Sequence, residues 1–156
     1  MTNSDASFAI AHALLDATMP WPAWTNLGCW QRRDGSSVGT QLTQYVEAAK
    51  ELALRVGAAA ISAPGKCVVD LGCGHGASLL LWSQQFAAAQ VIGIELQSAC
   101  VEGWQQHEQP VAGISLHQGR FDQLPLSQNI SALLPATGAD AVVCVDAAYH
   151  ADSLGA

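Results

Sequence analysis

Basic residues are scarce in this chain of 156 residues. Six Lys and Arg face thirteen Asp and Glu, so the formal net charge at pH 7 is −7. A polyanion such as DNA or RNA would be repelled by this charge, and no basic stripe is present to offset the repulsion. The composition therefore predicts no nucleic-acid partner and favours a small ligand that is uncharged or cationic.

Long apolar runs are also missing. No run approaches the roughly 20 residues that a membrane-spanning helix requires. The first basic residue is Arg32, so the basic start of a secretory signal is absent. We therefore expect no membrane partner and a cytoplasmic location.

Paired cysteine spacing is the third absence. The cysteines are few, odd in number and scattered: Cys29, Cys67, Cys73, Cys100 and Cys144. This pattern argues against a disulfide framework and against a zinc site. It predicts reduced thiols in a cytosolic compartment and no bound metal.

Apolar residues, in contrast, are abundant and follow the periods of an α/β fold. Hydrophobic residues make up 50% of the chain and charged residues 12%, which favours a packed core. Apolar segments predict strands at 67–71, 91–94, 114–117 and 141–145 and helices at 5–17, 38–60, 77–88, 98–107 and 127–134. This alternation predicts an α/β, Rossmann-like parallel sheet with flanking helices and right-handed crossovers.

The predicted organisation has two parts, an N-terminal helical arm at 1–62 and the sheet-forming part at 63–156. The sequence runs on for about ten residues past the fourth predicted strand, which would leave that hydrophobic strand as an unprotected edge. We therefore expect the N-terminal half of a longer domain, with a sheet incomplete on its C-terminal side. The alternative is a compact variant that covers the edge with its own N-terminal helices or by forming a homodimer.

The most informative segment reads VVDLGCGHGA at residues 68–77. A buried strand ends there in a carboxylate, and glycines turn the chain into a helix. Such a turn brings bare backbone to the carboxyl edge of a sheet, where open α/β sheets bind nucleoside cofactors. Gly72, Gly74 and Ala77 match the pattern G-x-G-x-x-G/A, which alone does not separate a nicotinamide cofactor from S-adenosylmethionine.

Asp70 favours S-adenosylmethionine. A carboxylate beside the turn would repel a pyrophosphate, because two like charges at about 4 Å cost on the order of 1 kcal/mol in water and several times more in a partly dry site. S-adenosylmethionine instead carries an ammonium and a sulfonium cation, which a carboxylate attracts. Two structural alternatives stay open: Asp70 as a cap on the following helix, and the glycines as a mere tight turn.

This segment resembles the first motif of class I S-adenosylmethionine-dependent methyltransferases. The resemblance implies that the backbone of Gly72, Cys73 and Gly74 approaches the methionine part of the cofactor, with Asp70 beside it. The segment VIGIEL at 91–96 resembles the family's second motif. It implies that Glu95 accepts the ribose hydroxyls and that the residue after it, Leu96, packs against adenine.

Two later segments continue the resemblance in order. In GRFDQLP at 119–125, Arg120 occupies the usual acidic position, so Asp122 or the backbone of Phe121 would contact the adenine amine; Asp122 as a turn-forming residue is the alternative. The segment ADAVVCVDAAYH at 139–150 is similar to the family's motif before the substrate pocket. Val145 in this segment is implied as a further cofactor contact.

An N-terminal segment, NLGCW at 26–30, resembles the Asn-x-Gly-Tyr-Trp segment of small-molecule methyltransferases, where it caps the cofactor. The resemblance makes the arm at 1–62 a cofactor cap and Trp30 a cofactor-binding residue, with Cys29 in place of the usual Tyr. Trp21, Trp24 and Trp30 would line a pocket for an aromatic or prenylated acceptor, or would pack the arm onto the sheet.

His150 is the candidate catalytic base. It follows the fourth strand, and its ordinary pKa of about 6.5 suits proton removal from a hydroxyl or amine. Asp146 would orient it. A surface position for His150, and a strand-closing role for Asp146, are the alternatives. His75, inside the glycine turn, is expected to face solvent.

The predicted function is methyl transfer from S-adenosylmethionine to a small organic acceptor, by O-, C- or N-methylation. Three rivals remain: a cofactor-binding fragment without activity, a nicotinamide-dependent oxidoreductase, and an interaction module that uses the exposed fourth strand. The sequence does not identify the acceptor.

Overall fold

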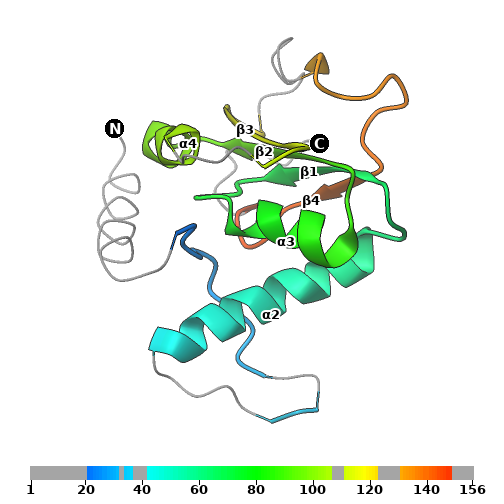
Figure 1. Cartoon of the computed structure of the whole chain (residues 1–156). Helices are drawn as coiled ribbons and strands as arrows, with labels where there is room; N and C mark the ends of the chain where they lie inside the picture. Colours follow the sequence, from blue (N-terminus) through cyan, green and yellow to red (C-terminus); the bar gives the residue numbers. More distant parts are fainter. Residues whose placement is uncertain (1–20, 32–33, 37–41, 107–110, 123–130, 149–156) are drawn as a thin grey trace.

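The computed structural model describes residues 21–31, 34–36, 42–106, 111–122 and 131–148. They form a four-stranded sheet in the order β3-β2-β1-β4, with all neighbours parallel (Figure 1). The strands are β1 (Cys67–Leu71), β2 (Gln90–Glu95), β3 (Ile114–Gln118) and β4 (Ala141–Val143). The prediction of an α/β, Rossmann-like parallel sheet is confirmed.

Three described helices cover one face of this sheet: α2 (Leu42–Ala60), α3 (Ala77–Phe86) and α4 (Ser98–Gln105) (Figure 1). Their apolar sides join alternate strand residues such as Val68, Val91 and Val143 in one buried cluster. Because successive strand residues point to opposite faces, these positions all belong to the same side of the sheet. In the described part of the chain no helix is long and apolar enough to cross a bilayer.

The opposite face carries a smaller cluster. Cys67, Val69, Ile92 and Ile94 pack there against apolar residues of the segment 131–139. At the edge strand β4, Val142 pairs with Val69 in register and is 59% exposed. Within the described residues β4 is an edge strand, as the sequence predicts.

Element boundaries differ from the predictions at the strand and helix ends. The expected strand at 141–145 pairs only over 141–143, because the chain then turns and Asp146 adopts a left-handed φ of 59°. Helix α3 ends at Phe86, where Ala87 takes a φ of 50°. The predicted helix at 5–17 lies outside the described residues, as do residues 127–130 of the helix expected at 127–134.

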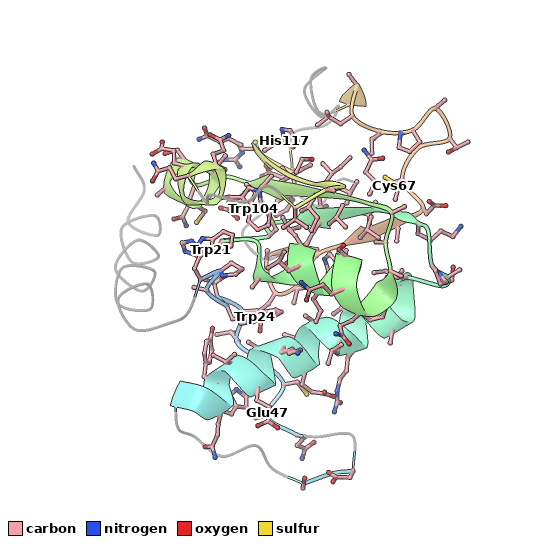
Figure 2. All side chains as sticks on the ribbon, viewed as in Figure 1. Trp21, Trp24, Glu47, Cys67, Trp104 and His117 are labelled. Carbon is pink, nitrogen blue, oxygen red and sulfur yellow. The ribbon has the colours of Figure 1, made fainter. Side chains whose placement is uncertain are left out.

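The N-terminal segment before α2 crosses the carboxyl ends of the strands. Trp21 lies beside Trp104 of α4, with ring centroids 5.4 Å apart (Figure 2). Farther along, the Asn26 side chain donates to the carbonyl of Ala49, and the Cys29 amide donates to the carbonyl of Ala48. These bonds dock the segment on α2 next to the glycine turn.

Candidate functional site

The glycine turn follows β1 directly at the carboxyl edge of the sheet. Gly72 and Gly74 have φ values of 70° and 55°, a region that residues with a Cβ rarely adopt. A Cβ on Gly72 would lie 2.5 Å from the Cβ of Ala147, and one on Gly74 would lie 2.7 Å from Oγ1 of Thr25. The glycines are therefore required by both backbone conformation and close approach of two other chain segments.

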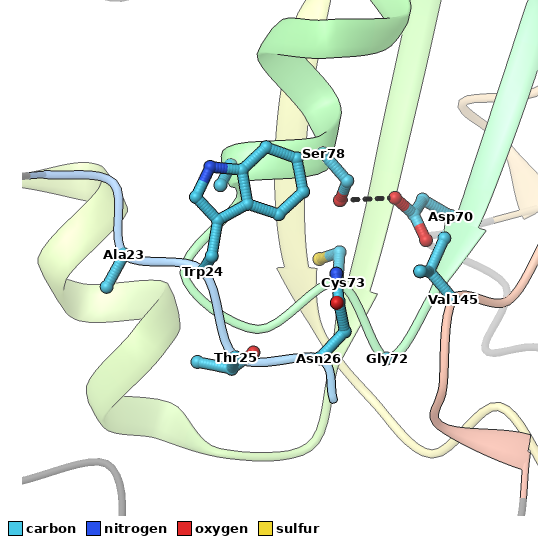
Figure 3. A pocket seen from close by; sticks show the side chains of 10 residues that line it. Ala23, Trp24, Thr25, Asn26, Asp70, Gly72, Cys73, Ser78 and Val145 are labelled. Atoms are coloured by element: carbon cyan, nitrogen blue, oxygen red, sulfur yellow. Dashed lines mark hydrogen bonds between the residues drawn. The ribbon is translucent and has the colours of Figure 1, made fainter. Parts of the chain in front are cut away.

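Asp70, at the end of β1, is only 1% exposed. Its Oδ2 accepts hydrogen bonds from the Ser78 hydroxyl at 2.6 Å and from the Trp82 indole at 2.7 Å (the first is drawn in Figure 3). Its Oδ1 has no hydrogen-bond partner among the described residues. A buried carboxylate oxygen without a partner is costly, so this atom marks a place where a donor or cation would be stabilised.

Burial raises the pKa of Asp70 to about 6. The hydrogen bonds from Ser78 and Trp82 oppose this rise, and the negative charge of Glu95 adds to it. Both donors come from the same face of α3, where they are four residues apart. The predicted alternative, in which Asp70 caps the helix, is wrong: Gly76 is the N-cap of α3, and no side chain caps it.

Glu95 ends β2 beside Asp70, and both of its oxygens have backbone partners. Oε2 accepts from the Gly74 amide and Oε1 from the Gln97 amide, each at 2.9 Å. A carboxylate has about four lone-pair positions, so each oxygen can accept one more hydrogen bond. Glu95 thus holds the glycine turn and keeps acceptor capacity for a diol.

A small cavity lies between the glycine turn and the N-terminal segment. It is lined by residues of both: Ala23, Trp24, Thr25, Asn26, Asp70, Gly72, Cys73, Ala77, Ser78 and Val145 (Figure 3). Its volume is about 20 Å³, which is space for a single water, whereas small-ligand pockets span roughly 300–1,000 Å³. Residues 23–28, named the strap below, form one side of this cavity through residues 23–26.

The strap is fixed at several points. The Tyr45 hydroxyl of α2 lies 2.7 Å from the carbonyl oxygen of Asn26 and 3.2 Å from that of Trp24. The Leu27 amide donates to Oδ2 of Asp146, beyond β4. Burial, and then the charge of Asp146, raise the pKa of Tyr45, so that its hydroxyl keeps the proton it donates.

The turn residue Cys73 is buried and lines the cavity with its small side chain. Burial raises the pKa of its thiol well above the ordinary value, and the charges of Asp70 and Glu95 add to this effect. The thiol is therefore neutral, and Cys73 contributes packing, while its amide donates to the carbonyl of Ile94. All five cysteines lie in the described residues, and none of them forms a disulfide.

His75 was expected to face solvent, and this prediction is wrong. Its ring is buried, and Nε2 lies 3.7 Å from Sγ of Cys100 on α4. The turn curls inward because Gly76 packs against the Trp104 ring, where a Cβ would lie 2.6 Å from ring carbons. Within the described residues, no group of three or more His, Cys, Asp or Glu side chains is arranged to hold a metal.

The remaining predicted cofactor residues lie at varying distances from the cavity. Val145 lines it, and the Phe121 ring lies 3.5 Å from a Cβ built on Gly72. Leu96 is 51% exposed at the end of β2. Asp122 is held by Arg120, whose guanidinium donates to both carboxylate oxygens at 2.9 and 2.6 Å.

Two other predicted residues, Trp30 and Asp146, do not line the described cavity. Trp30 donates its indole proton to the Leu27 carbonyl and packs on Tyr45, with ring centroids 6.3 Å apart. Asp146 accepts the strap amide, and His150 lies outside the described residues. Residues 23–26, upstream of Trp30, lie over the turn instead.

Sequence reasoning missed four residues that build the site: Thr25, Tyr45, Ser78 and Trp82. A signal existed for two of them. Ser78 and Trp82 stand four apart on the first helix after the glycine turn, so both donors project from one helix face toward the strand that ends in Asp70. No comparable spacing relates Tyr45 to the strap.

A central parallel strand that ends in a buried carboxylate and a glycine turn defines a Rossmann-like nucleoside-cofactor domain. The comparisons with known proteins agree with this class. A family model described as "Methyltransferase domain" matches residues 68–154, which is more than half of the chain. The chain belongs to this methyltransferase-domain family and has the fold of class I S-adenosylmethionine-dependent methyltransferases.

Solved structures with this fold are similar over less than half of their own length. The 4+2 cyclase SpnF is 19% identical, with a TM-score of 0.55, over 78% of this chain and 42% of that chain. Geranyl diphosphate methyltransferase, in complex with GPP and sinefungin, is 18% identical, with a TM-score of 0.53, over 72% of this chain and 44% of that one. The YcgJ protein from Bacillus subtilis is 24% identical, with a TM-score of 0.51, over 66% and 40%. No curated protein matches the chain.

Proposed function

We propose that this chain binds S-adenosylmethionine over the glycine turn and serves methyl transfer to a small organic acceptor. The observation that carries the proposal is the unpartnered Oδ1 of Asp70. This atom is buried, and Asp70 lines the same cavity as Gly72 and Cys73. A cation near this atom would offset the cost of a buried negative charge.

The residues present fit this cofactor chemically. The turn offers close-approach backbone at Gly72 and Gly74, where a pyrophosphate would meet the carboxylates of Asp70 and Glu95. Glu95 has remaining acceptor capacity for the ribose hydroxyls. Leu96 and Phe121 are apolar surfaces at the same strand edge for the adenine.

The contact to the adenine amine is proposed for Asp122 or the Phe121 backbone. Both carboxylate oxygens of Asp122 already accept hydrogen bonds from Arg120. Only their remaining lone pairs are left for a further donor. This pairing favours the Phe121 backbone as the amine acceptor. Trp30 packs on Tyr45 and is proposed to support the strap rather than to touch the cofactor.

When bound, S-adenosylmethionine supplies both the methyl group and the leaving group, so the protein contributes mainly proximity and orientation. His150 as a general base and Asp146 as its orienting partner stay predictions. One oxygen of Asp146 already accepts the Leu27 amide. The net charge of −7 favours a neutral or cationic acceptor over an anionic one.

A second candidate function is cofactor binding without methyl transfer. One protein with this fold, SpnF, is named as a 4+2 cyclase, so the fold alone does not imply the transfer. A nicotinamide oxidoreductase is disfavoured by the two carboxylates at the turn.

Ligand-dependent melting separates S-adenosylmethionine binding from nicotinamide binding, and turnover assays separate methyl transfer from binding alone. We expect S-adenosylhomocysteine at 100 times its Kd to stabilise the protein by about 2.7 kcal/mol and to raise its Tm, with no shift from NADH. A shift with NADH alone would exclude the proposal. Binding of S-adenosylmethionine without turnover of hydroxyl, amine or enolisable-carbon acceptors would favour cofactor binding without methyl transfer.

A further inference from the structure

Between the strap and the glycine turn there is room for little more than a water, so a larger group can lie there only if the strap moves. Oγ1 of Thr25 lies against Gly74, and the remaining cavity holds about one water. Ligand entry at this site therefore requires residues 24–27 to move away from the turn. The contacts that hold those residues must then set how often the site opens.

Two side chains from different elements make these contacts. Tyr45 of α2 reaches two strap carbonyls through its hydroxyl, and Asp146 accepts the Leu27 amide from the loop after β4. Tyr45 is partly buried and lies close enough to Asp146 to feel its charge. Asp146 sits at a φ of 59°, a conformation rare for residues other than glycine, asparagine and aspartate.

The Asp146 contact differs from the attachment through Tyr45, Asn26 and Cys29, which joins the segment to α2. Asn26 and Cys29 bond to carbonyls of α2, so the end of the strap nearest α2 is anchored to a packed helix. The Leu27–Asp146 bond instead joins the strap to the sheet side of the cavity. Breaking that bond and the Tyr45 contacts frees the strap over the turn and leaves its anchor intact.

We propose that Tyr45 and Asp146 are positioning residues that form a clasp: they hold residues 24–27 closed over Gly72 and Gly74, and its release admits the ligand. This inference rests on the proposed function for the identity of the ligand. A closed state that must open before binding lowers the observed association rate by the open fraction. Because the closed strap leaves no room for the ligand, weakening the clasp speeds association, leaves dissociation nearly unchanged and lowers the apparent Kd.

Two deletions and one rescue test the clasp. Tyr45→Phe removes only the hydroxyl, and Asp146→Gly removes the carboxylate at a φ that glycine adopts freely. Asp146→Asn keeps an acceptor oxygen and tolerates the same φ. The matched control is Asp140→Asn, because Asp140 also accepts a backbone amide, that of Cys67, but at the opposite end of the strands.

Stopped-flow tryptophan fluorescence with S-adenosylhomocysteine measures the rates. We expect three- to tenfold faster association in both deletion variants, dissociation within about twofold of wild type and a Kd lower by the same factor by which association is faster, in line with the loss of one hydrogen bond from the closed state. Asp146→Asn should return most of the way to wild-type rates, and Asp140→Asn should stay within twofold. Unchanged or slower association in both deletion variants would overturn the clasp.

Hydrogen exchange without ligand separates this inference from the proposed function. The Leu27 amide should exchange at least tenfold faster in Asp146→Gly, while core amides such as Val69 keep their protection. If S-adenosylhomocysteine fails to bind wild type, the proposed function fails, and this exchange result still decides the clasp. Equal protection of the Leu27 amide in wild type and in Asp146→Gly would exclude the clasp. Loss of protection at Val69 as well would indicate general unfolding and would also count against the clasp.

Discussion

The carboxyl ends of β1 and β2 carry two carboxylates of the same charge in opposite settings. Asp70 is bonded by two side chains on one oxygen and has no partner on the other. Glu95 is bonded by two backbone amides, one on each oxygen. Backbone amides tie Glu95 to the shape of the turn, whereas the free oxygen of Asp70 adds cost to the fold and is available to a ligand.

Glu95 and Asp70 therefore have different roles. Glu95 stabilises the folded turn before any ligand arrives, and its bonds to Gly74 and Gln97 span the approach to α4. Asp70 carries a charge whose burial is unfavourable, as its raised pKa reports. A site that stores unfavourable charge for a cationic ligand trades stability for binding. Substitutions at the two positions should therefore diverge.

The largest expected effect is that of Asp70→Asn on affinity. We expect the Kd for S-adenosylhomocysteine to rise about a hundredfold, because a charge-assisted contact to the ligand's ammonium is lost. The Tm at pH 7.5 should stay the same or rise by a few degrees, since asparagine can still accept from Ser78 and Trp82 without burying a charge. Calorimetric titration and thermal melting measure both.

The sign of the stability change follows from the pKa of Asp70. Its folded value of about 6 lies above the ordinary 3.8, so the folded state holds this proton more tightly than the unfolded chain. The Asp70 contribution to the free energy of unfolding therefore falls as pH rises from about 4 to about 6, and stays low above that. A lower Tm with unchanged affinity in Asp70→Asn would make Asp70 a structural residue only.

Glu95→Gln is expected to have the next largest effect, and in the opposite sense for stability. Glutamine offers one acceptor oxygen and one amino group, so one of the two amides, Gly74 or Gln97, would face a donor. An unsatisfied buried amide costs about 1–3 kcal/mol, and we expect Tm to fall by several degrees. The Kd should rise about thirtyfold as the turn loosens. An unchanged Tm would mean that Glu95 does not stabilise the folded turn and does not differ from Asp70 in this respect.

How far the sequence predicts this site depends on the kind of contact. Asp70, Gly72, Gly74 and Glu95 were predicted to lie together because the carboxyl ends of neighbouring parallel strands share one edge. That rule needs only strand assignment and chain direction. The order β3-β2-β1-β4 was not predicted, because right-handed crossovers fix the hand of each connection and not the side on which the next strand is added.

Contacts that depend on side-chain packing between distant segments were not predicted. The strap reaches the turn through Thr25, and its path is set by the Tyr45 hydroxyl, 20 residues along the chain. No periodicity relates such positions. The burial of His75 depends likewise on the Trp104 ring filling the space beside Gly76, which the glycine pattern alone does not reveal.

Gly74→Ala tests whether the strap and the glycine turn are in close steric contact. A Cβ would lie 2.7 Å from Oγ1 of Thr25, at a φ of 55°. We expect about a tenfold rise in the Kd for S-adenosylhomocysteine. Adding Thr25→Ala should restore part of the lost affinity, because the steric clash is removed. The strain of the left-handed backbone, about 1–2 kcal/mol, remains.

Gly138→Ala is the matched control for this substitution. Gly138 has a φ of 81°, and a Cβ there would meet no atom within 4 Å. It therefore carries the backbone strain alone and should change Tm without changing the Kd. Equal effects of Gly74→Ala with and without Thr25→Ala would mean that the two segments do not press on each other.

The smallest expected effect is a pH dependence that separates the two carboxylates without any substitution. With a pKa of about 6 for Asp70, roughly a quarter of the molecules carry the charge at pH 5.5 and nearly all carry it at pH 7.5. The affinity for S-adenosylhomocysteine should therefore fall about fourfold between pH 7.5 and 5.5, measured by calorimetric titration in matched ionic strength. The same titration on Asp70→Asn should be flat over this range, whereas Glu95→Gln should keep the dependence. A fourfold change that persists in Asp70→Asn would assign the titrating group elsewhere, and Asp70 would then not be the ligand's charge partner.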